Sequence, residues 1–293
     1  MLKDLTYFFT ISRPPNILIS LVAFGASCYI ASSHQFYFLQ DPHFWGVSIT
    51  IILIAATGYW INDVYDFRID RINKPQRAIV NAKLSVKKVL TAYIIVNFAI
   101  SFFSLVNFSL LHGLYPISFI NITSIVLLFW YASYLKRTGA AGNLLIAFLI
   151  ALVVLLAGYL YRINMPLIWT LVFAFQITLI REITKDVEDI KGDLAFQLHT
   201  LPIQIGIRNT KRVLTILYIL FIVSCNLPLA YYYLKEGQFL WEYLGVSLTL
   251  VQLPIFYLLY LLTRSAFPSD FSIQSRYLKY IMVSGILSIL LLG

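Results

Sequence analysis

Residues 44–70 read FWGVSITIILIAATGYWINDVYDFRID, a predominantly apolar run that ends in three aspartates. Its first 18 residues, 44–61, carry no charge. A membrane-spanning helix needs about 20 apolar residues, so this run predicts a helix that crosses a bilayer. The whole chain of 293 residues is 60% hydrophobic and only 12% charged, with a mean hydropathy of +0.80. This composition is far more apolar than that of a soluble domain and predicts a polytopic membrane protein.

Apolar runs of similar length recur along the chain. We expect nine spans, at residues 17–33, 44–61, 89–111, 115–135, 142–161, 165–180, 213–234, 239–263 and 277–292. Hydrocarbon cannot satisfy an open sheet edge, and the alternating segments of a membrane β-barrel are missing from the sequence. The predicted fold class is therefore an all-α membrane protein, a bundle of nine transmembrane helices formed by a single domain over residues 1–293.

Lys and Arg are unevenly divided between the two sides of this predicted bundle. The N-terminal segment and the segments after the second, fourth, sixth and eighth spans hold 20 of the 22 basic residues when Lys279, at the start of the ninth span, is counted with the last of them, and the opposite loops hold only Arg162 and Lys235. Short basic loops face the cytoplasm, so we expect a cell inner-membrane protein with a cytoplasmic N-terminus and an external C-terminus. The basic face would attract membrane lipids and anionic substrates, whereas nothing suggests nucleic acid. The oligomeric state stays open.

Eight of the 13 acidic residues lie in the segments after the second and sixth spans. Each segment has three aspartates with the spacing D-x2-D-x3-D: Asp63, Asp66 and Asp70 in the first triplet, and Asp186, Asp189 and Asp193 in the second triplet. Positions i, i+3 and i+7 share one face of a helix, so each triplet predicts one stripe of carboxylates. Gly192 is expected to break the second helix near its end.

Carboxylates this close repel one another beside a low-dielectric membrane interior unless cations lie between them. The candidate donors are oxygens, with no cysteine nearby and only His199 in the second segment, which favours Mg²⁺ over Ca²⁺ or Zn²⁺. A solvated, salt-bridged loop is the alternative, but two copies of one spacing on one face argue against it. We therefore expect two opposed stripes that hold Mg²⁺ together with a phosphate ligand.

Basic residues accompany both triplets. They are Arg68, Arg71, Lys74 and Arg77 after the first, Arg181, Lys185 and Lys191 within the second, and Lys136 and Arg137 in the segment between. A diphosphate binds through guanidinium and ammonium contacts as well as through metal. Bases within a turn or two of the aspartates, Lys185 included, are therefore expected to bind substrate, whereas distant ones such as Lys83 and Lys87 are interpreted as topology signals.

The stretch NDVYDFRIDRINKP, residues 62–75, resembles the N-D-x-x-D-x-x-x-D signature of the UbiA superfamily of intramembrane prenyltransferases. Asp189 and Asp193 resemble the second, D-x-x-x-D motif of that family. RPPN at residues 13–16 is similar to its R-P-x-N entry to the first helix, and YLKR at 134–137 to its basic site between the fourth and fifth helices. The resemblance covers the whole chain, and the two acidic motifs together are highly specific.

This resemblance implies Mg²⁺-dependent transfer of a polyprenyl group from an allylic prenyl diphosphate to an acceptor. It implies that four aspartates are catalytic and bind Mg²⁺: Asp66, Asp70, Asp189 and Asp193. It further implies that Asp63 and Asp186 assist at the metal, and that Asn62 assists them. The residues implied to contact the diphosphate or to orient its neighbours are Arg13, Asn16, Arg77 and Lys136.

Within the superfamily, residues 181–193, residues 200–206 and the pair Gly142 and Asn143 are similar to the digeranylgeranylglyceryl phosphate synthase branch. That similarity implies an ether lipid precursor of the geranylgeranylglycerol phosphate type as the acceptor. The segment around Arg77, QRAIVNAKLS, departs from the proline and short turn expected in that branch, so aromatic acceptors such as 4-hydroxybenzoate or a naphthoate stay open. A cation transporter, the non-enzyme alternative, would place its acids near the bilayer midplane.

Overall fold

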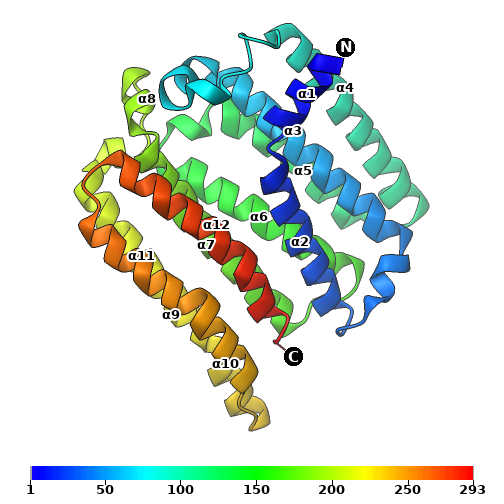
Figure 1. The fold of residues 1–293 in the computed structure, drawn as a ribbon. Coiled ribbons are helices and arrows are strands. Elements are labelled where there is room, and N and C mark those ends of the chain that lie inside the picture. The colour runs from blue at the N-terminus through cyan, green and yellow to red at the C-terminus, as the bar shows by residue number, and fades with distance from the viewer. Residues whose placement is uncertain (1, 293) are drawn as a thin grey trace.

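The computed structural model describes residues 2–292, with the side chains of Leu2 and Arg77 left aside. Within this range the chain is built of helices, and an isolated bridge joins Val80 to Leu84 in a turn. Figure 1 shows the long helices running roughly along one direction in a bundle. The predicted all-α class is confirmed.

Eight helical segments are long and apolar enough to cross a membrane. They are α2 (Pro14–Ala31), α3 (Pro42–Asn73), α4 (Val86–Phe103) with its π-helical continuation η3 (Ser104–Leu111), α5 (Tyr115–Ser133), α6 (Ala140–Leu160), α7 (Met165–Glu188), α9 (Leu201–Glu236), and the continuous run of α10 (Trp241–Ser247), η5 (Leu248–Gln252) and α11 (Leu253–Arg264). The ninth predicted span falls in α12 (Pro268–Ile289), which is not among the eight and carries three charged residues in its first 12 positions. The ninth crossing therefore stays a prediction.

The helix α3 is much longer than the predicted span 44–61. Its first turn is capped by Asp41, whose carboxylate accepts from the His43 N–H at 2.9 Å, and Pro42 occupies the first helical position. From there α3 stays helical to Asn73. The first aspartate triplet thus lies on the end of a long helix rather than in a loop, because no glycine or proline interrupts the chain between the apolar run and the aspartates.

Short helices that the sequence did not predict complete the bundle. They are α1 (Leu2–Ile11), η1 (Phe36–Gln40), η2 (Pro75–Arg77), η4 (Leu135–Arg137) and α8 (Ile190–Ala195). α1 begins at the same end of the bundle as α8, and α12 ends at the opposite end (Figure 1). This arrangement agrees with termini on opposite faces, while the orientation in a membrane stays a prediction.

The helix α7 lies in the middle of the bundle and packs against α6, α12 and α9 (Figure 1). α2 packs on α6, and α3 packs on α4 and α5. Polar side chains also join helices inside the core: Asn121 of α5 donates to Thr50 Oγ1 of α3 at 3.2 Å and to Ser104 Oγ of η3 at 3.1 Å. Such bonds hold helices together where apolar burial alone gives little preference for one register.

Candidate active site

The first aspartate triplet lies on one face of the end of α3. Asp63 and Asp66 are buried, and Asp70 is partly exposed. The side-chain amide of Asn62 donates to Asp66 Oδ2 at 2.8 Å. Because the backbone is helical throughout, the spacing puts the three carboxylates on one stripe, as predicted.

Basic side chains from two other elements pair with this triplet. Arg13, which precedes α2 with a left-handed backbone (φ 53°), places Nη2 2.5 Å from Asp63 Oδ1, and its guanidinium lies 4.8 Å from the centre of the Tyr59 ring. Lys136 of η4 forms an ion pair with Asp66. Burial alone would lower the pKa of Lys136, but the charge of Asp66, together with Tyr131, the hydrogen bond to Asp66 and the charge of Asp193, raises it above that of a free lysine. Lys136 is therefore a fixed positive charge at the first triplet.

The second triplet is not carried by one helix. α7 ends at Glu188 and α8 begins at Ile190, so the break falls at Asp189 and the predicted break at Gly192 is wrong. Asp186, still on α7, accepts from Asn143 Nδ2 at 2.8 Å. Asp193 lies buried on α8. The second triplet therefore depends on the angle between two helices.

The end of α3 holds this break in place. Asn73 Nδ2 donates to the Asp189 carbonyl at 2.9 Å, and the Gly192 N–H donates to Asn73 Oδ1 at 2.8 Å. A Cβ atom at Gly192 would lie 2.4 Å from Asn73 Nδ2, so only glycine allows this close approach. Lys74 Nζ adds an ion pair of 2.7 Å to Asp189 Oδ2. The helix of the first triplet thus positions the second triplet.

Lys136 also influences the second triplet electrostatically. Burial raises the pKa of Asp193 to about 6; the charge of Lys136 opposes this rise, and the charges of Asp189 and Asp66 add to it. Lys136, the ion-pair partner of Asp66, thus acts on Asp193 as well, so one base influences both triplets. α3 also packs directly against α8. The expectation of opposed carboxylate stripes therefore agrees with the geometry.

The six aspartates outnumber their basic partners. The ion pairs are Asp63 with Arg13, Asp66 with Lys136, and Asp189 with Lys74. No three His, Cys, Asp or Glu side chains among the described residues are gathered into a ready metal cluster, and cationic side chains stand between the carboxylates instead. The oxygen-only donors and the uncompensated negative charge fit Mg²⁺. The assignment of individual carboxylates to metal stays a prediction.

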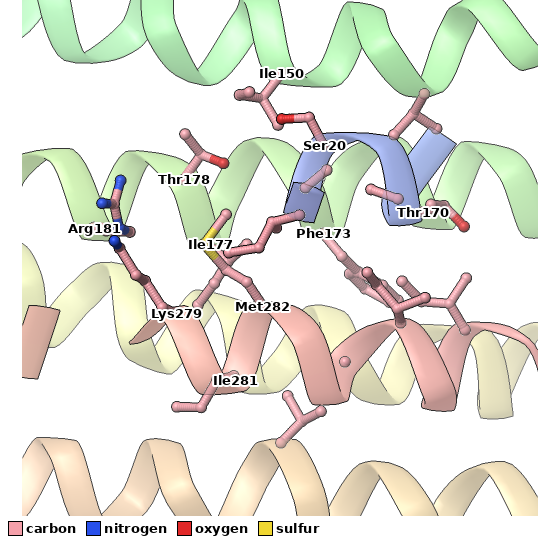
Figure 2. Close-up of a pocket in the computed structure, with 18 of the residues that line it drawn as sticks. Ser20, Ile150, Thr170, Phe173, Ile177, Thr178, Arg181, Lys279, Ile281 and Met282 are labelled. Carbon is pink, nitrogen blue, oxygen red and sulfur yellow. The ribbon is translucent and has the colours of Figure 1, made fainter. Parts of the chain in front are cut away.

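An apolar cavity of about 140 Å³ lies among α2, α6, α7, α9 and α12 (Figure 2). Ile150, Phe173 and Met282 are among the residues that form its walls. Its polar lining consists mainly of Asn16, Tyr59, Arg181, Glu182 and Lys279. The cavity therefore joins an apolar chamber to a charged rim on the same helices that carry the acidic residues.

The predicted substrate-binding residues fall into three groups. Asn16 lines the cavity and donates to the Tyr59 hydroxyl at 3.1 Å. Arg13, Asn62 and Lys136 contact aspartates of the first triplet. Lys185 instead pairs with Glu182 Oε2 at 3.2 Å. The side chain of Arg77, at the end of η2, lies outside the described part of the chain.

Three further residues lie at the candidate site or line the cavity beside it: Asn73, Asn143 and Lys279. Asn73 contacts residues 116 and 119 positions away in the chain, which no local pattern could indicate. Asn143 was noticed only as part of a motif and not as a partner of Asp186. Lys279 carried a usable signal, since an ionisable residue inside a predicted span is a functional candidate by default.

A helical membrane bundle with two aspartate triplets beside an apolar chamber forms the kind of site that binds a ligand with an anionic head group and an apolar tail. The model of the UbiA prenyltransferase family matches residues 18–277. The chain is also 38% identical over 213 residues to the digeranylgeranylglyceryl phosphate synthase of Saccharolobus solfataricus, which covers 70% of this chain and 72% of that protein. The synthase of Methanosphaera stadtmanae is 35% identical over 228 residues, covering 77% and 78%.

Solved structures share the fold. A digeranylgeranylglyceryl phosphate synthase structure aligns with a TM-score of 0.73 and 25% identity, covering 99% of this chain and 98% of the other. A UbiA homologue from Archaeoglobus fulgidus, bound to DMAPP and Mg²⁺, aligns with a TM-score of 0.66 and 14% identity, covering 94% and 99%. The chain is thus an integral membrane enzyme of the prenyltransferase class. It belongs to the UbiA prenyltransferase family.

Proposed function

We propose that this enzyme transfers a prenyl group from an allylic prenyl diphosphate to the hydroxyl group of a geranylgeranylglycerol phosphate-type acceptor, with Mg²⁺ as its cofactor and residues 1–293 as one catalytic domain. The observation that supports the proposal is Lys136, a half-buried cation that forms an ion pair with Asp66 of one triplet and whose charge lowers the pKa of Asp193 of the other. The names of the similar synthases support the acceptor.

The reaction breaks the bond between C1 of the prenyl chain and the diphosphate oxygen, and the bonding electrons leave with the diphosphate. The acceptor oxygen then bonds to C1 and loses its proton. Mg²⁺, when bound, would stabilise the negative charge that develops on the diphosphate. The residues that would hold it are Asp66, Asp70, Asp189 and Asp193, with Asp63 and Asp186 beside them.

The protein's own cations and cavity supply the rest of the chemistry. Lys136 and Arg13 are held in place by aspartates and offer fixed positive charge to the leaving group, which is the preorganisation that lowers a barrier most. The apolar chamber beside them keeps water from the allylic carbon as it becomes positively charged. Asn16 and Tyr59 would bound the chamber at its polar rim.

The ion-transport alternative fits the arrangement poorly. Its acids should lie near the middle of the bundle in interrupted helices. Here the aspartates gather where α3 and α7 end, and Arg13, Lys74 and Lys136 stand among them and would repel a passing cation.

The test is activity of the purified protein in nanodiscs with radiolabelled geranylgeranyl diphosphate and geranylgeranylglyceryl phosphate. We expect transfer with Mg²⁺ and none after EDTA. Parallel reactions with 4-hydroxybenzoate and a naphthoate decide whether the acceptor is aromatic instead. Turnover that is indifferent to EDTA, or ion flux without transfer, would contradict the proposal.

A further inference from the structure

Arg13 has a backbone conformation that arginine rarely adopts. It lies between α1 and α2 with φ 53° and ψ 60°, in the left-handed region, and Pro14 follows it. A residue with a Cβ atom is disfavoured in that region, and a residue before proline is normally extended. Such a conformation persists only where the surrounding structure holds it, and it is frequent at functional sites. The bend at Arg13 therefore needs contacts that compensate for its cost.

The preceding residue, Ser12, provides one such contact. Its N–H and its hydroxyl both donate to the Phe8 carbonyl, at 3.0 Å and 2.7 Å, and so close the end of α1. The same hydroxyl accepts from Trp60 Nε1 of α3 at 2.8 Å. The Trp60 ring also packs edge-on against the Phe8 ring, with 4.9 Å between the ring centres. Since a serine hydroxyl can donate and accept at once, Ser12 connects the end of α1 to α3.

The helix α3 thus contacts the Arg13 segment on both its backbone side and its side-chain side. Trp60 binds the backbone side through the Ser12 hydroxyl. On the side-chain side, the Tyr59 ring centre lies 4.8 Å from the guanidinium carbon, and Asp63 pairs with the guanidinium. These three α3 residues lie within five positions of one another, and α1 packs directly on α3 (Figure 1). One short piece of α3 therefore holds both the root and the tip of the arginine side chain.

A small apolar core keeps Trp60 and α1 together without the hydrogen bond. Phe8 and Trp60 pack against the buried side chains of Ile11, Ile79, Val80, Leu84 and Val89. A phenylalanine at position 60 would keep much of this ring packing and lose only the indole N–H. The hydrogen bond between Trp60 and Ser12 can therefore be removed separately from the packing that anchors α1.

Resting on the proposed function, in which Arg13 offers positive charge to the leaving diphosphate, we propose that Ser12 and Trp60 are positioning residues for Arg13. Neither is among the described residues that line the apolar cavity, so their effect passes through Arg13. They fix the left-handed backbone from which the long arginine side chain starts, and the guanidinium is then directed at the anion before the donor binds. Such preorganisation avoids the ordering of a flexible side chain during the reaction.

The test uses Ser12→Ala and Trp60→Phe, each of which removes the bond from Nε1 to Oγ. Steady-state kinetics with geranylgeranyl diphosphate and geranylgeranylglyceryl phosphate are combined with calorimetric titration of inorganic pyrophosphate in Mg²⁺. We expect each variant to lower kcat/KM for the donor about 3- to 10-fold and to weaken pyrophosphate binding by a similar factor, the worth of one hydrogen bond. The KM for the acceptor should change less than about twofold. Ser12→Thr, which keeps the hydroxyl, should restore most of the loss.

Two matched variants remove bonds of the same kind elsewhere on the same helices. On α1, Thr10→Ala removes the bond of 2.8 Å from Oγ1 to the Thr6 carbonyl. At the other end of α3, Trp45→Phe removes the bond of 2.9 Å from the indole N–H to the Leu39 carbonyl. Both controls should keep wild-type donor kinetics and pyrophosphate affinity. An equal loss in Thr10→Ala would show general damage to α1 and would overturn the positioning role.

The double variant of Ser12→Ala with Arg13→Gln tests whether Ser12 acts through Arg13. Once the guanidinium is gone, removal of the Ser12 hydroxyl should change pyrophosphate affinity and donor kcat/KM by less than about twofold. A loss as large as the one in the wild-type background would show an independent effect and overturn the inference. Thermal melting identifies any variant that has not folded, and the comparison of Trp60→Phe with Ser12→Thr then gives the answer.

Failure of the proposed function gives a different result, because the wild type would then transfer a prenyl group to no acceptor. Pyrophosphate affinity still reports on the position of Arg13 in that case, since it requires no turnover. Transfer by the wild type, with unchanged donor kinetics and pyrophosphate affinity in both Ser12→Ala and Trp60→Phe, refutes the positioning role alone.

Discussion

The two aspartate triplets share the spacing D-x2-D-x3-D but are built differently. The first lies on the unbroken end of α3, whereas the second is divided between α7 and α8 by a break at Asp189. The first receives its cations from the distant residues Arg13 and Lys136. The second is held mainly by Asn73 and Lys74, which lie at the end of the helix that carries the first.

An identical spacing of aspartates therefore does not specify the backbone that presents them. The backbone of the first triplet is positioned by the continuous helix α3. The second is positioned by tertiary contacts, so its alignment should be sensitive to residues that touch neither substrate nor metal.

The largest effects should come from removing one charge from each triplet. We expect Asp70→Asn and Asp193→Asn each to lower kcat by about 10²- to 10³-fold or more, because each removes a ligand for the charge that stabilises the leaving group. Neither aspartate has an ion pair in the described structure, so the melting temperature of each variant in EDTA should equal that of the wild type. Asp4→Asn, at the exposed pair with Lys88, is the control and should keep full activity.

An intermediate effect should follow from loosening the break at Asp189. Asn73→Ala leaves the Gly192 N–H and the Asp189 carbonyl without their partner, which costs about 1–3 kcal/mol of stability, and misalignment of the second triplet should lower kcat about 10- to 100-fold. Steady-state kinetics measure the loss of kcat, and thermal melting measures the loss of stability.

Gly192→Ala sharpens the same test. Alone it should be about as damaging as Asn73→Ala, because the new Cβ would lie 2.4 Å from Asn73 Nδ2. Combined with Asn73→Ala it should cost less than the sum of the two, since the clash is gone. Gly25→Ala, in α2 with no atom near its Cβ, is the control and should be neutral or slightly stabilising. If the losses caused by Gly192→Ala and Asn73→Ala simply added in the double variant, the contact between Gly192 and Asn73 would be contradicted.

The smallest effects should come from single hydrogen bonds to the triplets. Asn62→Ala removes the bond to Asp66, and Asn143→Ala removes the bond to Asp186, both of 2.8 Å. We expect each to lower kcat/KM about 3- to 10-fold, the worth of one hydrogen bond. Steady-state assays of the two variants, run side by side, measure the two losses of kcat/KM. A much larger loss at Asn143 would mean that the second row is the less rigid of the two.

The sequence predicted much of this molecule because its main signals are local. Apolar runs of membrane length predicted helices that the structure contains, and the carboxylate spacing predicted the stripe on α3. The break at Asp189 could not be predicted, because Asn73 stabilises it from 116 residues away. Gly192 was misread as a helix breaker for the same reason, since its lack of a side chain serves the contact with Asn73.

The chamber rim was hidden for a different physical reason. Arg181 and Lys279 are far apart in sequence and meet only because α7 and α12 pack together. Lys279 lies inside the predicted ninth span, but the sequence does not show that it reaches the cavity beside α7.

The central claim is that both carboxylate rows hold the divalent metal together with the donor. The direct measurement is a Mn²⁺ titration followed by electron paramagnetic resonance, with and without a non-ionisable thiodiphosphate analogue of the donor, in the wild type, Asp66→Asn and Asp193→Asn. The account predicts analogue-dependent Mn²⁺ binding in the wild type and its loss in both variants. Binding that survives unchanged when either row is altered would contradict it.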